Sequence, residues 1–109
     1  NGCDPAIGEI VASSDIRSKL RLNIVNSLRL VCDGGPSVQE KDVHMAGTLL
    51  LGEDPVACDA VGYTILNEAR SLRGLSPLLS EARIPRQLVT AAAFGLGHAD
   101  IEEIEIDNI

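Results

Sequence analysis

Aromatic residues are scarce in this 109-residue chain, which has no Trp, one Phe and one Tyr. Base stacking on aromatic side chains is therefore excluded as a way to bind nucleic acid. Basic residues are also few, with 9 Lys and Arg against 16 Asp and Glu, and the net charge of -7 repels a phosphate backbone. We expect no nucleic-acid partner, and we expect a core of Leu, Ile, Val and Ala.

Cysteine is scarce too, and Cys3, Cys32 and Cys58 lie far apart with no Cys-x-x-Cys spacing. This pattern argues against a disulfide framework and against a self-contained zinc or iron-sulfur site. The apolar neighbours of Cys32 and Cys58 predict two small core residues, and Cys3 is the more exposed thiol. We therefore expect no cofactor held by this chain alone.

Long apolar runs are missing, since no stretch approaches the roughly 20 residues that a membrane helix needs. We expect no membrane span. The length suits one domain over residues 1–109. Because the chain begins at Asn1 and has neither a starting Met nor a signal peptide, we expect part of a longer protein whose targeting signal lies outside this sequence.

The chain is organised around residues 49–60, where a leucine run leads through Gly52 into Asp54-Pro55. A short apolar run is typical of a strand covered on both faces. Asp followed by Pro is a strong signal for a helix start. A buried stripe should follow on this helix, made of Cys58, Val61, Ile65, Ala69 and Leu72.

Apolar periodicity gives the other expected elements. Leu20, Leu22 and Ile24 should face the core from a strand, and Leu88, Val89, Ala92 and Ala93 should face it from a helix. Residues 28–31 fit either a strand extension or a short helical turn. The sequence predicts an α/β fold with a small helix-backed sheet of about three or more strands, as part of a larger α/β domain. The expected helices are 5–13, 55–73 and 84–94, the strands 20–25, 46–51 and 101–106, and the loops 16–19, 37–43 and 75–83.

Polar residues and glycines follow the expected strands. In open α/β sheets, ligands bind at the carboxyl ends of strands and at the helix starts that follow them. This rule would gather the polar residues at one rim of the sheet. The candidate ligand-binding residues are Asn26, Asp33, Gly34, Gly35, Asp54 and Asp59.

The two aspartates near the helix start invite different interpretations. An N-cap role explains Asp54, because its carboxylate would accept backbone N–H groups. Asp59 lies in a run that otherwise looks buried, and a buried carboxylate needs partners. It either bonds a loop or an arginine such as Arg21 or Arg29, or it serves as a metal or catalytic carboxylate with Asp33 or a group outside this sequence. It is the best metal candidate.

Motifs for a named reaction are absent, including Gly-x-Ser-x-Gly, His-Glu-x-x-His and the P-loop. His44 and His98 lie far apart, and neither has a second ligand at helical spacing, so both should be surface or loop residues. Gly95-x-Gly97 follows a helix, which favours a helix stop over a phosphate loop.

Two segments, GEDPVACDAVG over residues 52–62 and GLGHADIEEI over 95–104, together resemble the C-terminal part of the domain-of-unknown-function family 362. In that family a strand leads into T-D-P-V-A-x-D-A, and G-L-G-x-x-D-x-x-x-I follows later. Residues 3–7, 16–19 and 33–36 resemble the branch whose members often carry a twin-arginine export signal. Asn26 departs from the family, which often has an aspartate after the first strand.

The resemblance implies a preceding α/β portion, an exported protein and, in some members, an iron-sulfur module in the parent or a partner. Our first hypothesis is a small-ligand or metal-binding part of a larger, redox-linked protein. The alternative is a structural or dimerisation domain that completes the parent's sheet and leaves an apolar face or a strand edge exposed. A hydrolytic or transfer enzyme is a third, weaker hypothesis, because no nucleophile and base pair can be named.

Overall fold

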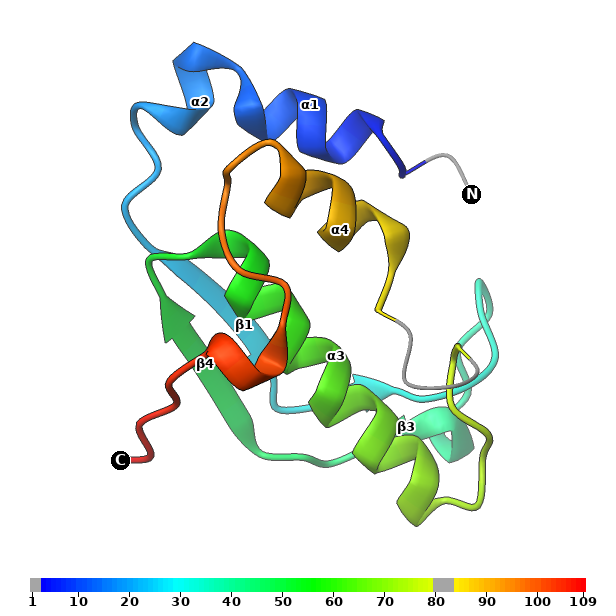
Figure 1. Cartoon of the computed structure of the whole chain (residues 1–109). Coiled ribbons are helices and arrows are strands. Elements are labelled where there is room, and N and C mark those ends of the chain that lie inside the picture. The colour runs from blue at the N-terminus through cyan, green and yellow to red at the C-terminus, as the bar shows by residue number, and fades with distance from the viewer. Residues whose placement is uncertain (1–2, 80–83) are drawn as a thin grey trace.

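The computed structural model describes residues 3–79 and 84–109, and its longest element is the helix α3 (Pro55–Leu72) (Figure 1). The helix begins as the sequence predicted, with Asp54 as N-cap and Pro55 in the first turn. It ends where Gly74 takes a positive φ of 71°, which lets the Leu75 N–H reach the Arg70 carbonyl. The predicted helix over 55–73 is confirmed.

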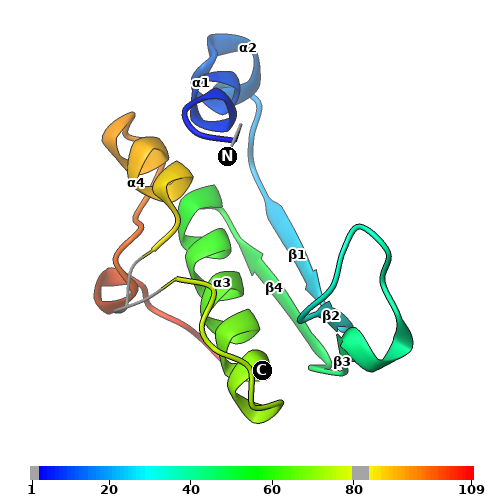
Figure 2. The ribbon, with the colours of Figure 1, turned by 90° about the vertical axis from the view of Figure 1, so that its right-hand side faces the viewer.

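A two-stranded antiparallel ribbon packs against α3 (Figure 2). It pairs β1 (Asn23–Ser27) with β4 (Thr48–Gly52), so that Asn23 lies opposite Gly52 and Ser27 opposite Thr48. A second ribbon pairs β2 (Leu30–Val31) with β3 (Val43–His44). Of the two alternatives for residues 28–31, the strand is correct, and the predicted α/β class with a small helix-backed sheet is confirmed.

The strands differ from their predictions in position and in facing. β1 begins three residues later than the predicted strand over 20–25, and Ser27 is its fully buried residue while Ile24 points to solvent. In β4 the leucine run is covered on one face only, with Leu50 half-buried and Leu49 and Leu51 exposed. A period of two shows that the faces alternate, but it does not say which face meets the helix.

Two layers of short helices complete the structure. α1 (Ala6–Ala12) confirms the predicted helix over 5–13, and α2 (Ser14–Arg17) replaces part of the expected surface turn. α4 (Arg86–Ala93) packs on both α1 and α3. Its buried residues are Leu88 and Ala91, so the prediction that Val89 and Ala93 face inward was wrong. The central cluster consists of Val56, Ala60, Leu88, Ala91 and Ala99.

The end of α3 is hydrogen-bonded to the segment that runs from β2 to β3. The Arg70 guanidinium donates to the Cys32 carbonyl, and the Arg73 guanidinium donates to the Val43 carbonyl at 3.0 Å. Within this segment a short 3-10 helix, η1 (Glu40–Asp42), replaces part of the predicted mobile loop over 37–43. Buried Asp42 accepts the Gln39 N–H at 3.0 Å.

The predicted strand over 101–106 is wrong. Residues Ile101–Glu103 form a 3-10 helix, η2, whose start is capped by the Asp100 carboxylate. Ile104 then packs against the central cluster, and residues 105–109 continue without regular structure. The alternating sequence pattern is present, but no strand among the described residues pairs with it. No helix of residues 3–79 and 84–109 is long and apolar enough to cross a membrane.

Candidate functional site

The two motifs that carry the family resemblance meet where β4 passes into α3. The Asp54 carboxylate caps the helix, with Oδ1 accepting the Ala57 N–H at 2.8 Å. Just before it, a Cβ at Gly52 would lie 2.6 Å from the Cys58 sulfur, so this position has no room for a side chain. The capping role predicted for Asp54 is confirmed.

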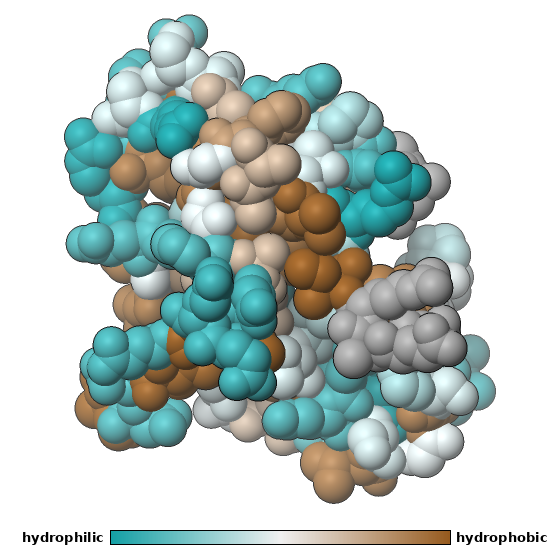
Figure 3. Space-filling model, viewed as in Figure 1, coloured by the Kyte–Doolittle hydropathy of each residue, from teal (hydrophilic) through white to brown (hydrophobic). Residues whose placement is uncertain are grey.

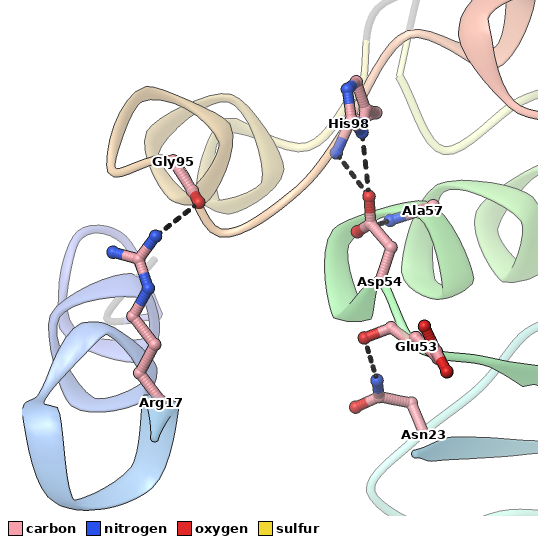
Figure 4. Close-up of polar contacts among 7 residues, drawn as sticks. All are labelled: Arg17, Asn23, Glu53, Asp54, Ala57, Gly95 and His98. Atoms are coloured by element: carbon pink, nitrogen blue, oxygen red, sulfur yellow. Dashed lines mark hydrogen bonds and ion pairs between the residues drawn. The ribbon is translucent and has the colours of Figure 1, made fainter. Parts of the chain in front are cut away.

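The loop after α4 binds the other oxygen of the same carboxylate (Figure 4). Asp54 Oδ2 accepts the His98 N–H at 2.8 Å and lies 3.0 Å from His98 Nδ1. A Cβ at Gly97 would lie 1.8 Å from Asp54 Oδ1, so only glycine fits there. We call these residues, Gly52, Asp54, Gly97 and His98, the junction.

Two further side chains hold the surroundings of the junction in place. Arg17 from α2 donates to the Gly95 carbonyl at 2.8 Å, just after the helix stop that the sequence predicted there. Asn23 from β1 donates to the carbonyls of Gly52 and Glu53 at 3.1 and 3.2 Å. β1 and the loop after α4 therefore meet β4 at the start of α3, and α2 holds that loop at Gly95.

The electrostatics of the junction favour an ionised carboxylate. Burial raises the pKa of Asp54. The hydrogen bonds from Ala57 and from the side chain and backbone of His98 together lower the pKa by more than burial raises it, so the pKa lies below its usual value. His98 is exposed, as predicted, yet it has a carboxylate partner that the sequence did not reveal.

The buried thiol beside the junction is poorly suited to nucleophilic chemistry. Desolvation raises the pKa of Cys58, and the charges of Asp54 and Asp59 raise it further. A thiol of raised pKa holds little thiolate, which is the reactive form. Cys58 therefore serves as a core residue, as its apolar neighbours predicted, and Cys32 is buried likewise.

The structure separates Asn26 from Asp54. Because β1 and β4 are antiparallel, Asn26 pairs with Leu49, three residues from the end of the ribbon that carries the junction. Three residues of a strand span about 10 Å. Asn26 is exposed, and its Oδ1 accepts the Leu28 N–H at 3.0 Å in a local turn. The expected common rim was wrong, since it assumed parallel strands whose carboxyl ends meet at one edge.

Asp33, Gly34 and Gly35 lie still farther along the chain path, after β2 at the opposite end of the ribbon (Figure 2). All three are exposed. Gly34 and Gly35 adopt positive φ angles of 76° and 96°, and a Cβ at Gly34 would lie 2.8 Å from the carboxylate of Asp42. Both glycines therefore lie in a tight loop, and Gly34 packs against Asp42.

Asp59 is exposed, contrary to our interpretation of its surroundings, although its neighbours Cys58 and Ala60 are buried. It lines a pocket of about 60 Å³ between α1, α3 and α4. Partial burial against these helices raises the pKa of its carboxyl. Among the described residues it has no hydrogen-bond or ion-pair partner, so neither Arg21 nor Arg29 pairs with it.

A groove of about 910 Å³ lies beside the junction. Hydrophobic surface gathers over the middle of this side of the molecule, between α4 and α3 (Figure 3). The Tyr63 hydroxyl is buried in the groove wall with no hydrogen-bond partner among the described residues. Further lining residues include Asn67, Val89, His98, Ile101 and Glu103.

Sequence reasoning missed the partner of Asp54 and the groove. His98 follows Asp54 by 44 residues, so no local spacing links them. The available signal was that the aspartate motif and the Gly-x-Gly-His motif occur in one short chain. Within the described part of the chain, no group of three or more His, Cys, Asp and Glu side chains is placed to hold a metal ion.

Comparison with known proteins bears on these motifs. The model of the family described as Domain of unknown function (DUF362) matches residues 4–64, which is more than half of the 109-residue chain. Neither the curated proteins nor the solved structures gave a match. The matched region contains α1, both strands of the main ribbon and the capped start of α3. The chain therefore belongs to the DUF362 family.

Proposed function

We propose that this chain is an interaction domain whose main ribbon is completed by another part of the same protein or by a second copy. One observation carries the proposal. The side of the ribbon away from α3 bears four large aliphatic residues that are between 52% and 64% exposed. We call these residues, Leu22, Ile24, Leu49 and Leu51, the ribbon face.

Two physical arguments support an occupant for the ribbon face. A soluble monomer rarely leaves contiguous aliphatic surface uncovered. A two-stranded ribbon is also marginally stable by itself and gains from further strands. Helix α3 covers the other side of this ribbon, where Val25 and Leu50 are half-buried, so the ribbon face is the side that lacks a layer (Figure 2).

The size of the ribbon face limits what can cover it. Covering the exposed half of each aliphatic side chain is worth about 1 kcal/mol, or about 4 kcal/mol for the face. Two such faces packed together would gain about 8 kcal/mol, against an association cost of about 4–15 kcal/mol. A segment tethered in the same protein avoids most of this cost, and the preceding α/β portion that the resemblance implies would be such a segment. A second copy must add other contacts.

The substitution Leu51→Asp tests the proposal. It should abolish self-association of the chain, or lower the soluble yield and thermal stability of the longer protein, because a carboxylate would then be buried in the interface. Leu72→Asp is the matched control, because Leu72 is 78% exposed on α3 and lies outside the ribbon face. Equal behaviour of the two variants in both settings would contradict the proposal.

A second candidate function is small-ligand binding in the groove beside the junction. Its volume of about 910 Å³ lies within the range of small-molecule sites, and its lining is apolar with a few polar groups. The buried Tyr63 hydroxyl supports this candidate, because a buried donor without a partner is costly. The residues that the sequence nominated do not line the groove, so the candidate site has moved.

Tyr63→Phe tests this second candidate. If a ligand accepts a hydrogen bond from the hydroxyl, the variant should lose the thermal shift that a metabolite library produces with the parent chain. If no ligand uses the hydroxyl, the variant should be more stable by about 1 kcal/mol, because it no longer buries an unpaired polar group. No shift in the parent chain with any compound would count against the groove.

We propose a metal role only for Asp59, whose exposed carboxylate has no partner among the described residues. One carboxylate is too few for a cation, so the remaining oxygen ligands would come from a longer protein. Metal analysis of the longer protein and of its Asp59→Asn variant tests this, and equal metal content would refute it. On the resemblance alone, we also propose that the longer protein is exported and that it associates with an iron-sulfur partner.

A further inference from the structure

One segment of the chain has the pattern of a strand but pairs with no strand among the described residues. Ile104 packs against the central cluster, and the five residues after it, Glu105, Ile106, Asp107, Asn108 and Ile109, are all exposed. Ile106 is 51% exposed. Over residues 104–107 isoleucine alternates with acidic residues, which is typical of a strand with one covered face. This segment therefore has the propensity to form a strand, but no strand among the described residues pairs with it.

The free edges of the main ribbon supply unpaired backbone groups. β1 and β4 form a two-stranded sheet, so each has one edge that pairs with no strand among residues 3–79 and 84–109. An open edge is a template for adding a strand from another chain. Such an added strand would also lie beside the ribbon face.

Charge distinguishes the two edges. Residues 16–32, which contain β1, carry Arg17, Lys19, Arg21 and Arg29 and no acidic residue. Residues 100–109 carry five acidic residues, at 100, 102, 103, 105 and 107, and no basic one. β4, in contrast, is followed by Glu53 and Asp54. An acidic strand is therefore attracted to the β1 edge and repelled from the carboxyl end of β4.

We propose that residues 105–109 of a second copy add as a strand to the free edge of β1, reciprocally in the two copies. The lengths agree, since β1 also has five residues. With Ile106 placed on the ribbon face beside Ile24, the alternation puts Glu105 and Asp107 on the opposite side, the side of Asn23. This inference rests on the proposed function and names a second copy as the partner that completes the ribbon.

The geometry favours a second copy over the same copy. η2 lies on one side of α3, and β4 and then β1 lie on the other (Figure 2). Five extended residues span about 17 Å. The chain after η2 already runs past α3, so that the C-terminus lies on the β4 side of this helix, and residues 105–109 would have to pass β4 to reach β1 within one copy (Figure 2). A reciprocal exchange also adds two sets of backbone hydrogen bonds, which supply the contacts that two ribbon faces alone lack.

Sedimentation velocity over a range of chain concentrations tests the inference. The parent chain should dimerise, and removal of residues 105–109 or the substitution Ile106→Pro should weaken the dimer at least tenfold. Proline removes a backbone donor from the added strand. Circular dichroism of each variant at low concentration checks that the monomer folds. A parent chain that stays monomeric, or a dimer unaffected by the truncation, would overturn the inference.

A charge exchange sharpens the test. Arg21→Glu with Arg29→Glu should weaken the dimer, and Glu105→Lys with Asp107→Lys in the same chain should restore it. The control Lys41→Glu makes the same change in net charge as Arg21→Glu alone, at an exposed position outside residues 16–32, and should leave the dimer intact. No loss on reversal, or loss without rescue, would contradict the proposed β1 edge.

The two levels of the proposal fail in different ways. If Leu51→Asp abolishes the dimer but truncation of residues 105–109 does not, the ribbon face is the interface and the occupant is wrong. If neither change affects the dimer, both the occupant and the ribbon face are wrong as the site of self-association. If only the truncation acts, residues 105–109 form the dimer without the ribbon face, and the proposed function is overturned.

Discussion

The junction and the ribbon face are opposite kinds of surface within one small domain. At the junction, both oxygens of Asp54 accept hydrogen bonds, and Gly52 and Gly97 leave no free space. On the ribbon face, four aliphatic side chains are more than half exposed. The polar groups of the junction are paired and its space is filled, whereas no layer covers the ribbon face.

This contrast indicates that the motif residues at the junction have structural roles. The Asp-Pro-Val-Ala motif and the Gly-x-Gly-His motif meet because one carboxylate caps α3 and holds the loop after α4. Packing and hydrogen bonding therefore account for these residues without any reaction. The residues that the fold does not explain lie elsewhere, on the ribbon face and in residues 105–109.

The largest expected effect comes from Gly97→Ala at the junction. The new methyl group would lie 1.8 Å from Asp54 Oδ1, so the loop must move away, at a cost of about 3 kcal/mol in the free energy of unfolding. Gly62→Ala in the middle of α3 is the matched control. Its Cβ would meet Val25 at an ordinary 3.6 Å, so urea unfolding should show a gain of about 0.5–1 kcal/mol.

A smaller loss is expected for Asp54→Ala, at about 2 kcal/mol, because the helix loses its cap and the loop loses its acceptor. Asp54→Asn should cost less, since an amide oxygen can still cap the helix while its NH₂ group faces the His98 N–H. If urea unfolding shows no difference between alanine and the parent residue, the junction is not the fastening that its geometry indicates.

The pH dependence of stability should follow the same carboxylate. The folded-state pKa of Asp54 lies below its unfolded value, so its contribution is present above pH about 4 and is lost as the pH falls below that. The difference in unfolding free energy between the parent chain and Asp54→Ala should therefore shrink in acid. A difference that is constant from pH 7 to pH 3 would refute the assignment.

The smallest effect is expected for Asp59→Asn, away from both regions. Partial burial raises the folded-state pKa of Asp59, so the unfolded chain loses this proton first and stability falls as the pH rises through that interval. At pH 7 the amide should be more stable than the carboxylate by only about 0.3 kcal/mol, because solvent screens an exposed charge. A clear loss of stability would reveal a partner for Asp59.

The same two regions show how far the sequence could lead. The start of α3 was predictable because Asp54, Pro55 and Gly74 act through their nearest neighbours in the chain. The facing of β1 was not, because alternation in residues 20–25 fits either face of a ribbon. Parallel strands were assumed, and the antiparallel register then separated Asn26 from Asp54.

The role of His98 and the structure of residues 101–106 could not be predicted from the sequence for a related reason. His98 acquires its role from a carboxylate 44 residues away, which only the folded chain brings near. Residues 101–106 have strand periodicity, but a strand forms only where another strand can pair with it. The local sequence pattern indicates the strand propensity of this segment, but the tertiary structure determines whether the strand forms.

Hydrogen–deuterium exchange of the chain at low and high concentration tests the central contrast most directly. The account predicts that the amides of β1 and of residues 105–109 become more protected as the concentration rises, while the Ala57 and His98 amides of the junction keep the same protection. Equal protection of β1 at all concentrations, or a concentration-dependent change confined to the junction, would contradict the account.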